Sequence, residues 1–131
     1  MVTSYGTLFV LLCLFQVKHM LADYFLQTRS MLDGRAEYKH FGRFLHAGIH
    51  ATGSMIVFVV VGTHLAFILP VILIEWAIHF HIDWWKGHYT YRQNLTPQDA
   101  GYWRATGVDQ ALHQVTYIAM IWGWLSWGLV A

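Results

Sequence analysis

The third apolar stretch of the chain decides the fold class, because it is long enough to cross a membrane and carries three ionisable groups in register. Residues 65–85 read LAFILPVILIEWAIHFHIDWW. A helix needs about 20 mostly apolar residues to span the hydrocarbon core of a bilayer. Glu75, His79 and Asp83 are spaced four apart, so a helix places all three on one face. This stretch predicts a membrane-spanning helix whose polar face is turned toward other protein.

Three further stretches repeat this pattern, and together the four predict an integral membrane four-helix bundle. The expected spans are residues 4–27, 41–62, 64–86 and 106–130. The composition agrees, since 56% of the 131 residues are hydrophobic and only 11% are charged, against about 25% in soluble domains. We predict an all-α fold in a single domain over residues 1–131, because open sheet edges are not tolerated in lipid.

Each expected span carries one pair of possible metal ligands four residues apart. The pairs are His19/Asp23, His46/His50, His79/Asp83 and Asp109/His113. Ionisable groups are expensive inside a membrane and normally face the bundle interior, where they pair or bind a ligand. A polar cluster can also serve only as hydrogen-bonded glue between helices. Four pairs are more than such glue requires, so we predict a shared site.

The basic residues predict the orientation of the bundle. The first and third loops, with the residues beside them, carry Arg29, Arg35, Lys39, Arg43, Lys86, Arg92 and Arg104, whereas the second loop and both ends of the sequence carry none. By the positive-inside rule the two long loops are cytoplasmic and both termini lie outside. All four ligand pairs then fall in the cytoplasmic half. We expect a pocket that opens inward and is closed by apolar residues further out.

The donor set predicts the kind of metal. It combines imidazole with carboxylate, which suits Zn, Mn or Fe. The single cysteine, Cys13, excludes a multi-cysteine site. One metal needs three or four ligands, so the set is large enough for one or two divalent transition metal ions. The predicted ligands are His19, Asp23, His46, His50, His79, Asp83, Asp109 and His113.

Several other polar residues have more than one interpretation. Glu75 and Asp109 are the candidate catalytic groups, as general base or proton relay. We expect Lys18, on the opposite side of its helix, to reach the headgroups unless that helix leaves the lipid earlier. Gly53 would allow close helix approach. We expect interhelical hydrogen bonds from Gln16, Gln27, Gln110 and Gln114, and interfacial or solvated positions for His40, His64, His81 and His88.

The motifs resemble those of a bacterial and phage family of small membrane proteins, domain of unknown function 3307. The segment from His19 to Gln27 is similar to its H-x-x-A-D-x-x-x-Q signature, and its later signatures follow as H-x3-H, H-x3-D and D-Q-x2-H. The resemblance covers nearly the whole chain. It implies the four-span architecture, a multi-pass protein of the bacterial inner membrane, and the same site residues, but no reaction.

Three functions are compatible with the sequence. The first is a membrane-embedded metal-dependent hydrolase acting on an amphiphilic or lipid-like substrate, with redox chemistry at a di-iron site as a variant. The second is a small ion or proton transporter, against which stand the apolar outer half and the lack of an inverted repeat. The third is a non-catalytic accessory subunit with a structural polar core. Membrane lipids are expected partners, a homodimer or a partner subunit is plausible, and the absence of a basic stripe excludes nucleic acid.

Overall fold

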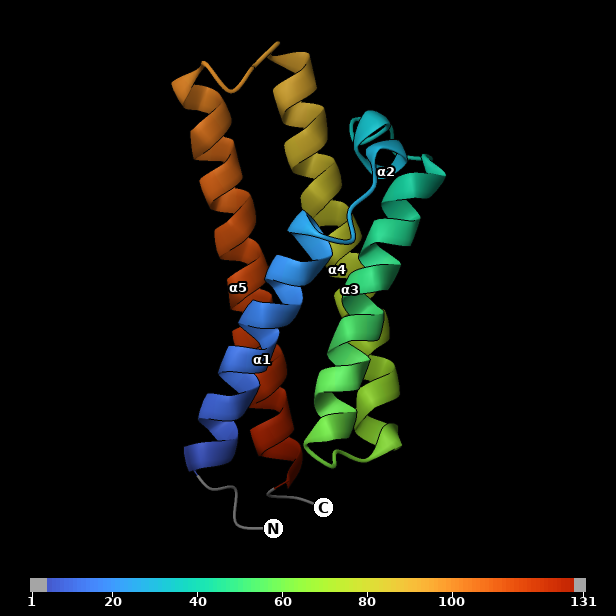
Figure 1. Ribbon diagram of the computed structural model, residues 1–131, viewed down its shortest axis with the longest axis vertical. Helices are drawn as coiled ribbons and strands as arrows, with labels where there is room; N and C mark the ends of the chain where they lie inside the picture. Colours follow the sequence, from blue (N-terminus) through green and yellow to red (C-terminus); the bar gives the residue numbers. More distant parts are fainter. Residues whose placement is uncertain (1–4, 129–131) are drawn as a thin grey trace.

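The computed structural model describes residues 5–128, and this part of the chain is all-α, as predicted (Figure 1). It contains five helices: α1 (Tyr5–Tyr24), α2 (Arg29–Asp33), α3 (Phe41–Val60), α4 (Leu65–Arg92) and α5 (Ala100–Gly128). The start of α1, the end of α5 and the α3–α4 turn lie at one end of the bundle, called the terminal end below (Figure 1). The α2 segment and the α4–α5 connection lie at the other, the loop end.

The four long helices close a ring around a common interior. α1 and α4 each pack against both α3 and α5, so they face each other across the ring. The short α2 packs on α3. Gly42 permits this contact, because a Cβ there would lie 2.7 Å from the Ser30 carbonyl oxygen. One face of every long helix therefore points into the same space.

The α3–α4 connection is a tight antiparallel hairpin. Gly62 supplies the turn with a φ of 75°, a conformation that glycine adopts without steric cost. His64 then caps α4, since its Nδ1 accepts a hydrogen bond from the Ala66 backbone N–H at 3.2 Å. Trp124 Nε1 donates to Thr63 Oγ1 at 2.8 Å, which ties α5 to the same turn.

Three of the helices, α1, α3 and α4, are long and apolar enough to cross a membrane. α5 is equally long but does not meet the same hydropathy criterion within its described residues. It carries Asp109, Gln110, His113 and Gln114 within six residues. Large apolar side chains are nevertheless exposed on the outside of all four long helices, for example Phe9, Ile56, Ile74 and Ile118. Such a surface is suited to lipid rather than to water.

The helix ends differ from the predicted spans at the loop end. α4 continues to Arg92 and α5 begins at Ala100, whereas the spans were expected to end at residue 86 and to start at residue 106. Hydropathy marks where lipid contact ends, but a helix continues until a residue breaks it. The break comes at Asn94, whose φ is 51°, and at Pro97.

At the first loop, α1 stops at Tyr24 instead of residue 27, and α2 forms where only a loop was expected. The predicted outer limits of the first and last spans, Ser4 and Val130, lie outside the described residues.

The interior of the ring is divided into two halves of different character. Toward the terminal end it is filled by an apolar cluster that includes Leu11, Phe15, Phe58, Ile68 and Trp124. Toward the loop end the buried residues are largely polar, among them five histidines. The apolar half holds the four helices together, and the polar half carries the candidate site.

Candidate metal centre and its pocket

Seven of the eight predicted ligands lie together in the ring. They form three groups whose possible ligand atoms are all within 4.8 Å of one another. The groups are His19, Asp23 and His50; His46, His50 and His79; and His79, Asp83 and His113. The i,i+4 spacing puts each helix's ligands on one face, and the closed ring turns the four faces toward each other.

Asp23 is the centre of the first part of the cluster. His50 Nε2 donates a hydrogen bond to its Oδ1 at 2.9 Å. His19 Nε2 lies 3.3 Å from Oδ2, and His46 Nε2 lies 3.4 Å from Oδ1. A single carboxylate from α1 thus meets three imidazoles, two of which come from α3.

Asp83 occupies the equivalent position on α4. Its Oδ2 lies 3.3 Å from His79 Nε2 and 3.6 Å from His46 Nε2, and its Oδ1 lies 3.4 Å from His113 Nε2. His46 is therefore within reach of both carboxylates. The cluster is one continuous arrangement of five imidazoles around two carboxylates, to which all four long helices contribute.

Asp109 is the one predicted ligand that is absent from these groups of described residues. It is buried, its Oδ2 accepts a hydrogen bond from Gln110 Nε2 at 3.2 Å, and its Oδ1 has no hydrogen-bond partner among the described residues. It lines the pocket beside the cluster together with Asp23, His46 and Asp83. Its position suits a group that acts on a ligand in the pocket.

Glu75, the other candidate catalytic residue, lies one turn further toward the terminal end and does not line this pocket. Its Oε1 accepts hydrogen bonds from Lys18 Nζ and Ser54 Oγ, both at 2.8 Å. The expectation that Lys18 reaches the headgroups is wrong, since its side chain is buried in this ion pair. Gly53 makes the room, because a Cβ there would lie 2.8 Å from Lys18 Cγ.

Tyr117 connects the two layers and was not singled out in the sequence. Its hydroxyl lies 2.9 Å from His19 Nδ1 and 3.3 Å from His50 Nδ1, and it accepts a hydrogen bond from Lys18 Nζ at 3.1 Å. The signal was present, because Tyr117 continues the four-residue spacing of Asp109 and His113. Aromatic residues are so common in these helices that the spacing alone did not distinguish it.

Three of the four glutamines, Gln16, Gln110 and Gln114, make the expected interhelical hydrogen bonds. Gln16 Nε2 donates to Gln114 Oε1 at 2.6 Å, and His19 Nε2 donates to Gln110 Oε1 at 2.9 Å. Gln27 follows the end of α1, and its Nε2 lies 3.5 Å from His46 Nε2. Of the off-site histidines, His64 caps α4, and His81 and His88 pack on Tyr38 and Trp84.

The cluster has the properties expected of a metal site. His79 Nε2 and His113 Nε2 are buried and make no hydrogen bond with any described residue. Unpartnered buried polar atoms are rare and call for a ligand or other explanation. Imidazole and carboxylate are suitable donors for Zn, Mn or Fe. Seven convergent donors are enough for one ion with hydrogen-bonded outer carboxylates or for two ions.

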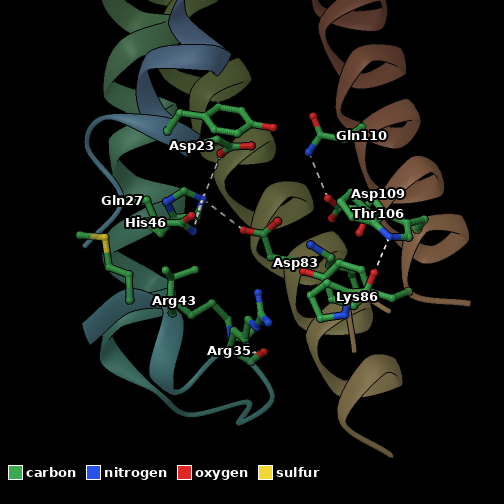
Figure 2. Close-up of a pocket in the computed structure, with 16 residues that line it drawn as sticks. Asp23, Gln27, Arg35, Arg43, His46, Asp83, Lys86, Thr106, Asp109 and Gln110 are labelled. Carbon is green, nitrogen blue, oxygen red and sulfur yellow. Dashed lines mark hydrogen bonds and ion pairs between the residues drawn. The ribbon is translucent and has the colours of Figure 1, made fainter. Parts of the chain in front are cut away.

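A pocket with a volume of about 300 Å³ leads from the cluster toward the loop end. Figure 2 shows Asp23, His46 and Asp83 around its centre, Asp109 and Gln110 on one side, and Arg35 and Arg43 at the end away from Asp23. The acidic residues and the histidine come from α1, α3, α4 and α5, whereas Arg35 follows α2. A molecule entering from the loop end would meet basic groups before it reached the carboxylates.

A comparison with protein families identifies the group to which the chain belongs. The model described as "Protein of unknown function (DUF3307)" matches residues 10–130. This match covers nearly all of the chain, so the chain belongs to that family, and the resemblance suggested by the motifs is confirmed. Comparison with curated proteins and with solved structures finds no match. All eight predicted ligands lie inside the matched range.

Proposed function

We propose that this member of the DUF3307 family is a membrane-embedded, metal-dependent hydrolase that acts on an amphiphilic substrate from the cytoplasmic side. One observation carries the proposal: seven separately predicted ligands converge at the base of a pocket that opens at the basic end of the bundle. Structural glue alone would not require two carboxylates and five imidazoles in one cluster.

The proposed topology has four spans, with α5 as the fourth and both termini outside, in the bacterial inner membrane. Seven of the eight Lys and Arg residues belong to the loop end, and the eighth is the buried Lys18. This distribution supports a cytoplasmic loop end. Reporter fusions to the C-terminus test the topology. Periplasmic activity is expected, and cytoplasmic activity would reverse the direction in which the pocket opens.

The cluster would hold one or two divalent ions, Zn, Mn or Fe, through His19, Asp23, His46, His50, His79, Asp83 and His113. A bound ion of this kind supplies activated water near neutral pH and a Lewis acid for a phosphoryl or carbonyl oxygen. The protein's own part is to fix the ligands on four packed helices and to close the terminal side with the apolar cluster. Both effects keep the site in one geometry and limit access to the pocket.

Asp109 is the better placed of the two candidate general bases. Its carboxylate lines the pocket, stands outside the ligand groups and retains a buried oxygen without a hydrogen-bond partner among the described residues. It can therefore accept a proton from water in the pocket. Glu75 is occupied by Lys18 and Ser54, so we assign it a structural role in the layer behind the cluster.

The competing functions lose support from the packing of the terminal half. A transporter needs a continuous path, but Leu11, Phe15, Phe58 and Ile68 are fully buried on the terminal side of the cluster. An accessory subunit with a structural core would not need buried imidazole nitrogens that lack hydrogen bonds. The accessory function is therefore the alternative that the metal measurement must decide.

Metal analysis of the purified protein is the deciding experiment. Wild type should contain a transition metal, and a His46→Ala/His50→Ala variant should lose most of it. His88→Ala is the matched control, because it removes an imidazole that packs on Trp84 outside the cluster. Metal in the double variant equal to that of wild type would place the metal elsewhere. If wild type contains no metal even after incubation with Zn, Mn and Fe, the accessory function is favoured.

A further inference from the structure

Three basic side chains line the pocket beside the cluster without being neutralised by a carboxylate. Arg35 lies between α2 and α3, Arg43 is in the first turn of α3, and Lys86 follows Asp83 by three residues on α4. The ion pairs among residues 5–128 include none of the three. Of the three carboxylates that line the same pocket, Asp23 and Asp83 are within ion-pair distance of histidines, and Asp109 is in no ion pair among residues 5–128. The pocket thus contains three basic side chains without a carboxylate at ion-pair distance among the described residues.

Arg43 is fixed in place with part of its guanidinium unused. Its side chain is only 2% exposed. Nε donates to the Glu37 carbonyl, and Nη2 donates to the carbonyls of Gly34, Arg35 and Glu37. Nη1 is buried and has no hydrogen-bond partner among the described residues. A buried charged donor without an acceptor is costly, so this nitrogen is suited to an acceptor supplied by a ligand.

The other two cations are held close to Arg43 by the backbone. The Arg35 carbonyl accepts a hydrogen bond from Arg43 Nη2. The same carbonyl packs against Gly87 on α4, where a Cβ would clash with it. Gly87 directly follows Lys86, so this close approach brings the Arg35 segment beside the lysine. The Thr106 hydroxyl, which is also buried without a hydrogen-bond partner among the described residues, lines the same pocket.

We propose that these residues bind the phosphate group of an amphiphile, and that the substrate of the proposed hydrolase is therefore a phosphate ester with an apolar tail. This proposal rests on the proposed function and specifies its substrate class. The planar donors of a guanidinium match the geometry of the phosphate oxygens. Three cations are also better suited to a phosphate group with two negative charges than to a carboxylate with one. Tyr24 and Trp103 line the same pocket and are 76% and 60% exposed, which offers apolar surface to the tail.

The reaction that follows is hydrolysis of the ester P–O bond. The oxygen of a water molecule forms a bond to phosphorus while the bond from phosphorus to the alcohol oxygen breaks. Asp109 accepts a proton from the water, and this proton passes to the leaving alkoxide. The products are inorganic phosphate and the free alcohol, and the reaction needs no further reactant than water.

Binding measurements in a neutral maltoside detergent test the proposal without relying on activity. The probes are dodecyl phosphate, inorganic phosphate and dodecanoate, titrated into metal-loaded wild type by calorimetry. Dodecyl phosphate should bind more tightly than either of the others. If inorganic phosphate bound as tightly as dodecyl phosphate, the proposed contribution of the apolar tail would be wrong. If dodecanoate bound as tightly, the proposed preference for phosphate over carboxylate would be wrong.

The variants separate the pocket from general surface charge. Arg35→Gln/Lys86→Gln should weaken binding of dodecyl phosphate about tenfold or more, since each charged hydrogen bond contributes that order of effect. Lys39→Gln/Arg104→Gln removes the same two charges outside the pocket and should bind like wild type. Arg43→Lys keeps the charge but loses the planar set of guanidinium N–H donors, and the folded variant should also bind dodecyl phosphate more weakly. Wild-type affinity in the Arg35/Lys86 variant would overturn the proposal.

The metal content of the same samples distinguishes a wrong substrate class from a wrong proposed function. Wild type that contains metal but does not bind dodecyl phosphate contradicts only the substrate class. Wild type that cannot be loaded with metal contradicts the proposed function itself.

Discussion

Two buried polar layers lie about one helical turn apart in this bundle, and they differ in how their charges are balanced. In the layer nearer the terminal end, Lys18 pairs with Glu75 at 2.8 Å. In the layer nearer the loop end, Asp23 and Asp83 meet histidines and, within residues 5–128, no Lys or Arg at ion-pair distance. The first layer contains its own cation, whereas the second lacks a permanent one.

The hydrogen bonds show the same difference. Lys18 Nζ donates to both Glu75 and Tyr117, and among the described residues of that layer only Oε2 of Glu75 is buried without a hydrogen-bond partner. In the second layer His46 Nδ1, His79 Nε2 and His113 Nε2 make no hydrogen bond with any described residue, although His79 Nε2 and His113 Nε2 lie 3.3 and 3.4 Å from the Asp83 oxygens. Buried ionisable residues in one bundle can therefore differ in how completely they are satisfied. The useful distinction is whether they satisfy one another or leave donors and acceptors for a ligand.

The largest effect is expected from breaking the self-contained layer. Lys18→Met leaves Glu75 as a buried unpaired carboxylate, and Glu75→Gln leaves Lys18 as a buried unpaired ammonium. Removal of one partner of a buried pair typically costs about 3–5 kcal/mol. The double variant Lys18→Met/Glu75→Gln removes both charges and should recover most of this loss. Unfolding by denaturant in mixed micelles measures all three variants.

The double variant also tests the division of roles between the layers. Because its ligands are intact, it should retain the metal content of wild type. If the double variant recovers stability but contains less metal than wild type, then the Lys18–Glu75 layer is part of the site, and the two layers do not have separate roles.

The sequence predicted the His/Asp cluster but not the Lys18–Glu75 pair. The spacing of His19/Asp23, His46/His50, His79/Asp83 and Asp109/His113 identified the cluster, because faces that are polar on all four helices can only turn inward. The partner of Glu75 was missed. On an isolated helical wheel Lys18 points away from the site, but α1 is enclosed by two neighbours and Gly53 leaves space for the lysine stem. Pairing across helices depends on packing that periodicity does not contain.

Arg43 shows a second limit of the sequence. Its charge contributed to the predicted orientation as a member of the basic loop end, but its burial depends on the α2–α3 segment folding back over it. Neither α2 nor the approach of Arg35 to Gly87 has a hydropathy signal. The basic side of the pocket therefore emerged only from the structure.

A smaller effect is expected from removing the ligand of the second layer. A ligand that binds only the folded state adds about 2.7 kcal/mol at a hundredfold excess over its dissociation constant. Chelator should therefore lower the melting temperature of wild type in detergent at neutral pH. Acid should weaken this response, since protonated imidazoles and carboxylates no longer bind metal. Thermal melts with and without chelator across the pH range provide the measurement.

A His79→Ala/Asp83→Ala variant is the reference for that experiment. It should melt at the same temperature with and without chelator. A wild type that is equally insensitive to chelator and to added metal would show that the second layer, like the first, is satisfied without a ligand.

Close packing between the layers predicts a moderate effect at Gly53. A Cβ there would lie 2.8 Å from Lys18 Cγ, near the base of the side chain, so the whole stem must move. Gly53→Ala should destabilise by about 1–3 kcal/mol, the usual cost of overpacking. Gly48→Ala on the same helix is the control, since its nearest neighbour would be 4.0 Å away. It should be neutral or slightly stabilising, and an equally neutral Gly53→Ala would show that Lys18 is loosely held.

The smallest effect is expected at a carboxylate outside both layers, which provides a reference for their response to pH. Asp99 is partly exposed before α5, and its Oδ2 accepts hydrogen bonds from the Thr96 backbone N–H at 2.7 Å and from Thr96 Oγ1 at 2.8 Å. The backbone hydrogen bond, and then the hydroxyl, hold the pKa of Asp99 below its ordinary value. A carboxyl group whose pKa is lower in the folded state adds stability above its unfolded pKa, near 3.9, and loses it as the pH falls through the folded value. Asp99→Asn should therefore lower the melting temperature slightly at neutral pH, with or without chelator, and the difference from wild type should vanish in strong acid. If the difference depended on chelator, the α4–α5 connection would be coupled to the second polar layer, and the response of that layer to pH could not be separated from that of the loop end.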